Sequence, residues 1–237
     1  MSNEYFKFKQ FTVRHDKCAM KVGTDGVLLG AWAPGGSKIL DIGTGTGLIA
    51  LMMAQRFEDA AVDAVEIDGD AVSQATDNVN DSEFGRRIKI FHAPLHDFAY
   101  GSGDVAGRYD CIVSNPPFYT EDTECPESKR HAARHTDSLS YGELFACASR
   151  LLSNGGTFSI IVPTEAKEKI LFEACMTKMF VKDICYIKTT PRKTAKRIMM
   201  SFTNVRPEET INEEHCLMNA DGSRSEWYVS VTGDFYL

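Results

Sequence analysis

The chain has 237 residues, of which 43% are hydrophobic and 25% charged, and its formal net charge is −7. This length and composition suit one globular α/β domain with a small extension, and the acidic total excludes a surface that binds nucleic acid all over, although a local basic face remains compatible with it. The seven cysteines form no CxxC pair and no apolar run reaches the length of a membrane span, so we expect free thiols, no zinc ribbon and a cytoplasmic protein without a membrane anchor.

The first 35 residues mix basic and aromatic side chains and end in an apolar, glycine-containing stretch. Pro34, Gly35 and Gly36 then form a plausible hinge. The sequence therefore predicts an N-terminal segment at 1–35 and a main domain at 36–237, together in one compact unit.

Strands and helices alternate through the main domain, which is typical of a parallel sheet with right-handed crossovers. We expect strands at 37–43, 61–67, 87–93, 109–114 and 155–163, with helices at 48–57, 68–80, 140–152 and 164–179. Asp68 is placed to cap the second of these helices, and the polar residues 119–138 are expected to form a loop.

Two further β-rich runs, 181–190 and 196–205, are separated by too few residues for a crossover helix. They must pair antiparallel. The predicted fold is thus a doubly wound, mostly parallel seven-stranded sheet that ends in an antiparallel hairpin. The tail at 206–237 can be read as strand, or as a helix capped by Ser225; we favour a helix packed on the core.

A glycine loop follows the first expected strand, in ILDIGTGTGLIAL. Gly43, Gly45 and Gly47 allow a tight turn and close approach of a ligand to the backbone. The spacing is GxGxG, because Leu48 occupies the position where a dinucleotide fingerprint has its third glycine. Asp41 would repel a pyrophosphate but suits an ammonium group, so the loop favours S-adenosylmethionine over NAD.

Two more acidic positions lie at the ends of the next strands. Glu66 ends the second strand, where a carboxylate can accept both hydroxyls of a ribose. Asp97 and Phe98 follow the third strand, and an acid beside an aromatic ring suits the exocyclic amine and the face of an adenine. The sequence therefore predicts an S-adenosylmethionine site along the carboxyl edge of the sheet.

The fourth strand ends in SNPPFYT. The Asn115 side-chain oxygen and the Pro116 carbonyl can both accept hydrogen bonds from one NH2 group, and Pro116 and Pro117 hold the backbone rigid. Phe118 offers a planar face to a planar ring. This combination favours methylation of an aromatic or amide amine, with catalysis by alignment and electrostatics and no general base before transfer.

DIGTGTG, VEID and NPPF resemble the class I S-adenosylmethionine-dependent methyltransferases that act on exocyclic amines. CAMKVGTDGVLLGAWA and the terminal GDFYL are more narrowly similar to the bacterial tRNA1(Val) adenine-37 N6-methyltransferase family. The resemblance implies a Rossmann-like methyltransferase fold, S-adenosylhomocysteine as product, and transfer to the N6 amine of a tRNA adenine at position 37. It also implies that Asn115, Pro116, Pro117 and Phe118 hold the target base.

By the same resemblance, the segment at 1–35 covers the cofactor site, with Thr24 and Asp25 over the methionine end. Basic residues near the expected mouth of the site favour tRNA phosphates as partners. The candidate RNA-binding residues are Arg14, Lys129, Arg130, Arg192, Lys193, Lys196 and Arg197.

Alternatives remain open on the residues alone. NPPF also suits a protein glutamine N5-methyltransferase, and a non-catalytic RNA-binding domain on a methyltransferase fold is a third possibility. The glycine spacing weakens an NAD dehydrogenase. His131 and His135 lack a third ligand, so we expect no metal, and we expect a monomer.

Overall fold

The computed structural model of the protein describes residues 4–18, 21–101, 106–117 and 139–237. The predicted loop at 119–138 and the candidate residues Phe118, Lys129 and Arg130 therefore lie outside the described residues.

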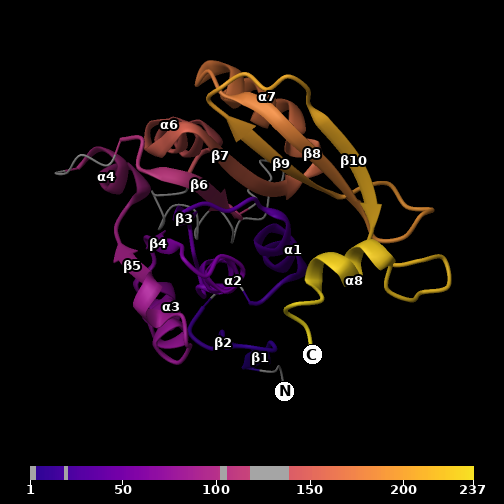
Figure 1. The fold of residues 1–237 in the computed structure, drawn as a ribbon, viewed down its shortest axis with the longest axis horizontal. Coiled ribbons are helices and arrows are strands. Elements are labelled where there is room, and N and C mark those ends of the chain that lie inside the picture. The colour runs from indigo at the N-terminus through magenta and orange to yellow at the C-terminus, as the bar shows by residue number, and fades with distance from the viewer. Residues whose placement is uncertain (1–3, 19–20, 102–105, 118–138) are drawn as a thin grey trace, which may run out of the picture.

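One eight-stranded sheet forms the centre of the molecule (Figure 1). Its strand order is β10-β8-β9-β7-β6-β3-β4-β5, and all neighbours are parallel except β9, which runs antiparallel to β7 and β8. The strands are β3 (Lys38–Ile42), β4 (Ala61–Glu66), β5 (Ile88–His92), β6 (Tyr109–Ser114), β7 (Leu152–Pro163), β8 (Phe180–Lys188), β9 (Arg197–Thr203) and β10 (Ile211–Cys216).

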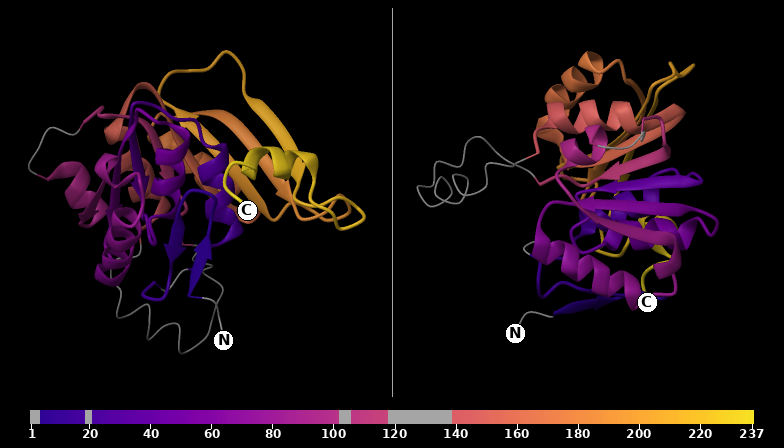
Figure 2. Two further views of the ribbon diagram at one scale, coloured as in Figure 1. Left: turned by 60° about the horizontal axis from the view of Figure 1, so that its bottom comes forward. Right: turned by 90° about the vertical axis from the view of Figure 1, so that its left-hand side faces the viewer.

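Helices cover both faces of the sheet, and each face has its own apolar core. Figures 1 and 2 show α4, α6 and α7 on one side and α1, α2, α3 and α8 on the other. The helices are α1 (Thr24–Trp32), α2 (Leu48–Arg56), α3 (Gly69–Asn80), α4 (Leu95–Tyr100), α6 (Tyr141–Leu151), α7 (Lys167–Met176) and α8 (Glu226–Thr232), with single 3-10 turns at η1 (Gly85–Arg87) and η2 (Thr164–Ala166). A separate two-stranded hairpin pairs β1 (Tyr5–Lys7) with β2 (Thr12–Arg14).

The doubly wound fold and its antiparallel β8–β9 hairpin are confirmed, but the predicted count of seven strands is one too few. The additional strand, β10, is parallel to β8 at the sheet edge. Its sequence, INEEHC, is mostly polar and its first four residues are exposed, so it lacks the alternation that marks a half-buried strand. The favoured C-terminal helix is confirmed as α8, with Ser225 as its cap.

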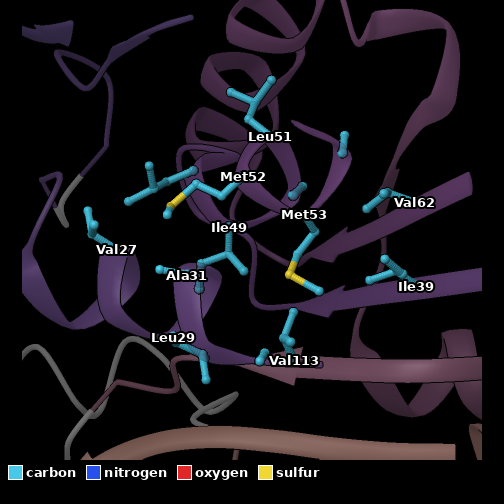
Figure 3. Packing of buried hydrophobic residues seen from close by; sticks show 14 of the residues in the cluster. Val27, Leu29, Ala31, Ile39, Ile49, Leu51, Met52, Met53, Val62 and Val113 are labelled. Atoms are coloured by element: carbon cyan, nitrogen blue, oxygen red, sulfur yellow. The ribbon is translucent and has the colours of Figure 1, made fainter. Parts of the chain in front are cut away.

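The β1–β2 hairpin, α1 and α4 were not predicted from the sequence. Six of the nine residues of α1 are buried and two are glycines, so the segment has no polar face that would mark an amphipathic helix. The N-terminal segment is nevertheless built into the main core: Phe8, Phe11 and Val27 are buried in the same cluster as residues of α2. Figure 3 shows Ala31 of α1 beside Ile49 of α2.

Among the described residues, no helix is long and apolar enough to cross a membrane.

Candidate active site

The centre of the site is the point where the strand order reverses. Chain order runs outward from β3 through β4 to β5 on one side, and from β6 to β7 on the other. In parallel sheets, ligands bind at the carboxyl ends of the two strands that flank this reversal. Ile42 pairs with Ser114 there, and the Ser114 hydroxyl donates to the Ile42 carbonyl at 2.9 Å. The ends of β3 and β6 are thereby fixed together.

The glycine loop lies directly beyond β3. Gly43, Gly45 and Gly47 have φ of 69°, 56° and 81°, a left-handed conformation that favours glycine. A Cβ added at Gly43 or Gly45 would meet no atom of the described chain within 4 Å, so both backbones face open space. Gly47 is the N-cap residue of α2 and offers no side-chain cap. The loop therefore presents bare backbone where a ligand can approach.

Asp41 lies under this loop and is completely buried. Its Oδ2 accepts from the Thr44 hydroxyl at 2.6 Å and from the Ala50 amide at 3.1 Å, which ties the strand, the loop and α2 together. Burial, more than any other cause, raises the pKa of the Asp41 carboxyl to about 7. Within the described chain, its Oδ1 is buried and accepts no hydrogen bond, so one polar atom remains for a ligand.

Glu66 fixes the glycine loop from the neighbouring strand. Its Oε2 accepts from the Gly45 amide at 2.9 Å, and Oε1 accepts from the amides of Ile67 and Asp68 at 2.8 and 3.0 Å. A carboxylate has about four lone-pair positions, so about one remains for a ribose hydroxyl in this arrangement. Glu66 thus combines a structural role with its predicted ligand role.

Asp97 and Phe98 are the third and fourth residues of the six-residue helix α4, which follows β5. The side chain of Asp97 is 72% exposed and lies 3.6 Å from the His96 ring nitrogen. The Phe98 ring packs edge-on against Phe91 with centroids 5.2 Å apart, and Phe98 itself is half-buried. The pairing of Glu66 with His92 brings this segment next to the end of β4.

Asn115 follows β6, next to the glycine loop. Within the described chain, its Oδ1 is buried and accepts no hydrogen bond. Pro116 is buried and Pro117 is exposed. The predicted acceptor pair thus lies directly after the strand that borders β3, with an amide oxygen available for a donor.

The first turn of α1 packs against Asn115. A Cβ added at Gly26 would lie 3.1 Å from Leu48 Cδ2 and 3.9 Å from Asn115 Nδ2. Thr24 is exposed, whereas Asp25 is half-buried and accepts from Arg197 Nε at 2.7 Å. The structure therefore pairs a residue predicted to contact the cofactor with one predicted to contact RNA.

The turn between β8 and β9 reaches the same edge of the sheet. Arg197 pairs with Pro163, the last residue of β7, and β7 ends beside β6. Arg192, Lys193 and Lys196 are exposed on this turn. These three predicted RNA-binding residues are therefore near the edge that holds Asn115.

Arg14 is the last residue of β2 in the N-terminal hairpin. Its guanidinium is 3.6 Å from Asp81, at the far end of α3 from Glu66, and α3 spans about 18 Å at 1.5 Å per residue. With Lys7 and Lys9 it lines a hollow of ≈ 450 Å³ on the β1–β2 hairpin. The Arg14 side chain thus belongs to a second basic area on the hairpin, although its backbone shares Asn78 as a hydrogen-bond partner with the Thr46 carbonyl of the glycine loop.

Sequence reasoning missed three polar residues that build the site. Thr44 donates to Asp41, Ser114 joins β6 to β3, and the buried Asn78 amide donates to the carbonyls of Thr46 and Arg14, both at 2.9 Å. The role of Thr44 could have been predicted from the sequence, because its hydroxyl follows the acidic residue near the strand end, Asp41, by three positions. Asn78 has no such signal, because its partners come from distant segments.

One group of described residues has metal-ligand chemistry: Cys185, Glu213 and His215 place their ligand atoms within 4.8 Å of one another. His215 already pairs with Glu213 at 3.0 Å and stacks on Trp227 with centroids 4.4 Å apart. Burial raises the pKa of the Cys185 thiol to about 12, which keeps it protonated.

A nucleoside with an ammonium group suits the donors and acceptors at this edge. Three features fit S-adenosylmethionine: the open backbone of the glycine loop, the Asp41 oxygen that accepts no hydrogen bond within the described chain, and the remaining lone-pair position of Glu66. The Asn115 oxygen, which likewise accepts no hydrogen bond within the described chain, fits a target amine beside the cofactor. The glycine loop at 43–47 itself contains no lysine or arginine that could bind a phosphate.

Comparison with known proteins agrees with this chemistry. Residues 23–186 match the family described as the methyltransferase small domain. A tRNA1(Val) (adenine(37)-N6)-methyltransferase of Bacteroides fragilis is 46% identical over 100% of this chain and 99% of its own length. Proteins of the same name from Christiangramia forsetii and Tolumonas auensis are 42% and 38% identical, again over the whole of this chain.

Solved structures show the same fold at low identity. A predicted O-methyltransferase from Agrobacterium tumefaciens superposes with a TM-score of 0.71 at 16% identity, covering 89% of this chain and 96% of that one. Geranyl diphosphate C-methyltransferase from Streptomyces coelicolor, solved with S-adenosyl-L-homocysteine, gives 0.54 at 12% identity over 76% of each chain. The chain is an S-adenosylmethionine-dependent methyltransferase of the methyltransferase small domain family, and within it belongs to the family of tRNA1(Val) (adenine(37)-N6)-methyltransferases.

Proposed function

We propose that this protein methylates the exocyclic N6 amine of an adenine in tRNA, at position 37 of tRNA1(Val). Relatives of that name match the chain over its full length, among them proteins that are 46% and 38% identical. The structural observation that supports the chemistry is the buried Oδ1 of Asn115, which accepts no hydrogen bond from the residues that the structure describes. Such an atom is expected where an incoming donor completes the hydrogen bond.

The proposed cofactor site uses residues from four segments. The backbone at Gly43, Gly45 and Gly47, the carboxyl groups of Asp41 and Glu66, and the Asp97–Phe98 pair would hold S-adenosylmethionine, with Thr24 and Asp25 on α1 nearby. When bound, it supplies an electrophilic methyl group carried on a sulfonium.

Asn115 and Pro116 would hold the target amine. Their two oxygens accept its two hydrogens, which turns the nitrogen lone pair toward the methyl group and stabilises positive charge on nitrogen as the new bond forms. The fixed φ of Pro116 and Pro117 keeps both acceptors in place at low entropic cost. The proton can leave afterwards, so no residue needs to act as a base before transfer. Phe118, outside the described residues, would stack on the base.

The exposed cations of the β8–β9 turn would contact tRNA phosphates. Arg192, Lys193 and Lys196 lie at the edge that carries the site, and an anticodon loop already exposes unpaired bases, so less unstacking is required than in a duplex. A monomer is sufficient for this arrangement, since every proposed ligand residue comes from one chain.

The test is transfer of labelled methyl groups to two substrates offered separately: total tRNA from a strain lacking this enzyme, and a cell protein extract. We expect label in tRNA, recovered as N6-methyladenosine in tRNA1(Val). Label in glutamine of a protein would instead establish the glutamine N5-methyltransferase alternative. Label in neither, with tRNA still bound, would leave a non-catalytic RNA-binding domain.

A further inference from the structure

The first turn of α1 is not fixed by a local cap. Its N-cap residue, Gly23, has no side chain to accept from the first amides, and Gly26 and Gly30 lower the intrinsic helix propensity. By contrast, α3 and α8 are capped by Asp68 and Ser225. The position of the α1 start must therefore come from tertiary contacts.

One such contact is an ion pair to a strand 172 residues away. Arg197 Nε donates to Asp25 Oδ2 at 2.7 Å, and the two side chains are only 34% and 25% exposed. Arg197 Nη1 donates to the Lys196 carbonyl at 3.1 Å, so the guanidinium is engaged on the protein side. A half-buried pair is screened less by salt than a surface pair, and a carboxylate in the first turn also suits the helix dipole.

The next residue along α1, Gly26, lies close to the proposed catalytic amide. The backbone of Gly26 leaves only 3.1 Å from its Cβ position to Leu48 and 3.9 Å to Asn115 Nδ2. A shift of the α1 start would therefore change the packing around the Asn115 side chain. It would also change the packing around Leu48, the first residue of α2 after the glycine loop.

We propose that the Asp25–Arg197 pair is a positioning device for the active site. Arg197 acts by holding Asp25, not by binding a tRNA phosphate, and Asp25 acts by fixing α1, not by touching the cofactor. Both residues therefore have roles different from those that sequence reasoning gave them. The inference rests on the proposed site at Asn115.

A double-mutant cycle tests it, using Asp25→Asn, Arg197→Met and the double variant. Each single variant is expected to lower kcat on tRNA by about 10- to 100-fold, the range for a small misplacement of catalytic groups. The two single variants should weaken S-adenosylhomocysteine binding, measured by calorimetry, to the same extent as each other. The double variant should show no lower kcat and no weaker S-adenosylhomocysteine binding than either single variant. Arg197→Lys, which keeps the charge, should recover part of kcat, with tRNA affinity unchanged throughout.

Other results would overturn the proposal. If Arg197→Met weakens tRNA binding and flattens its salt dependence while Asp25→Asn does not, Arg197 is a phosphate contact. If Asp25→Asn weakens S-adenosylhomocysteine binding far more than Arg197→Met, Asp25 touches the cofactor. Additive losses of kcat would show two independent roles.

The matched control is Glu214→Gln, which breaks another 2.7 Å ion pair of the same sheet, to Lys188, and should leave kcat unchanged. Failure of the wild type to methylate tRNA would reject the proposed function but not the positioning role of the ion pair. That role is tested separately, because S-adenosylhomocysteine affinity in the two single variants is measured without RNA.

Discussion

At the scale of single residues, Asn115 and Asp41 each keep a buried oxygen without a hydrogen-bond partner within the described chain. Such an atom costs about 1–3 kcal/mol of folding free energy, and a ligand that donates a hydrogen bond to it would recover part of this cost. The two oxygens belong to adjacent strand ends, β6 and β3. Their placement is consistent with two ligands meeting at the switch point.

Asn115→Ala is expected to lower kcat by at least about 100-fold, because it removes an acceptor that stabilises charge developing on the target nitrogen. S-adenosylhomocysteine affinity should stay near the wild-type value. Radiolabel transfer to tRNA and calorimetry measure the two quantities. Asn212→Ala, at an exposed position on β10, is the control, and an equal loss there would contradict the assignment.

Asp41 should give stability a distinct pH dependence. Burial raises its folded pKa to about 7, above the ordinary value of 3.8. Between these values the folded chain binds a proton that the unfolded chain does not, so this group's contribution to stability falls as pH rises from about 4 to 7 and stays low above 7.

Replacing Asp41 by Asn removes this titration. The free energy of unfolding of Asp41→Asn, relative to wild type, should therefore rise by up to about 4 kcal/mol between pH 4 and pH 8. Urea unfolding at several pH values measures it. A difference between the two proteins that does not vary with pH would show that the carboxyl is ionised throughout.

At the scale of elements, the β8–β9 turn carries the proposed RNA contacts. Charge reversal at Arg192 and Lys193 should weaken tRNA binding and reduce the slope of log affinity against log salt by about 0.7–1 for each lost phosphate contact. S-adenosylhomocysteine binding should not change, since both side chains are exposed on the turn. Filter binding at graded salt measures the slope, and an unchanged slope would remove the turn from the RNA interface.

At the scale of the whole molecule, the N-terminal segment and the C-terminal tail share one core. Phe8 lies in the same cluster as Phe235 and the residues of α2, and its ring stacks on Phe11 at 4.7 Å between centroids. The hinge predicted at Pro34 therefore joins two parts of one packed unit. We expect a single cooperative unfolding transition.

Phe8→Ala should lower the free energy of that transition by about 3–5 kcal/mol through lost burial and a residual cavity. Tryptophan fluorescence from Trp32 and Trp227 and far-ultraviolet circular dichroism should report the same midpoint. Two separate midpoints, with only one moved by the substitution, would show that 1–35 folds apart from the main domain.

Much of the site was open to prediction because its signals are local. Glycines at alternate positions after a strand, an acid at the next strand end, and NPPF after another strand depend on nearest neighbours in the chain and on the rule that parallel strands end at one edge. Asp68 and Ser225 could be predicted as helix caps for the same reason.

The sequence by itself thus determined the alternating architecture, the glycine loop and the strand that ends in Asn115. Only the tertiary structure decided that β10 adds to the sheet edge, that the Arg14 guanidinium pairs with Asp81, and that Arg197 pairs with Asp25. Propensity and periodicity act over a few residues, whereas these contacts join segments as far as 172 positions apart. Their partners are selected by packing of the complete fold, which no local pattern encodes.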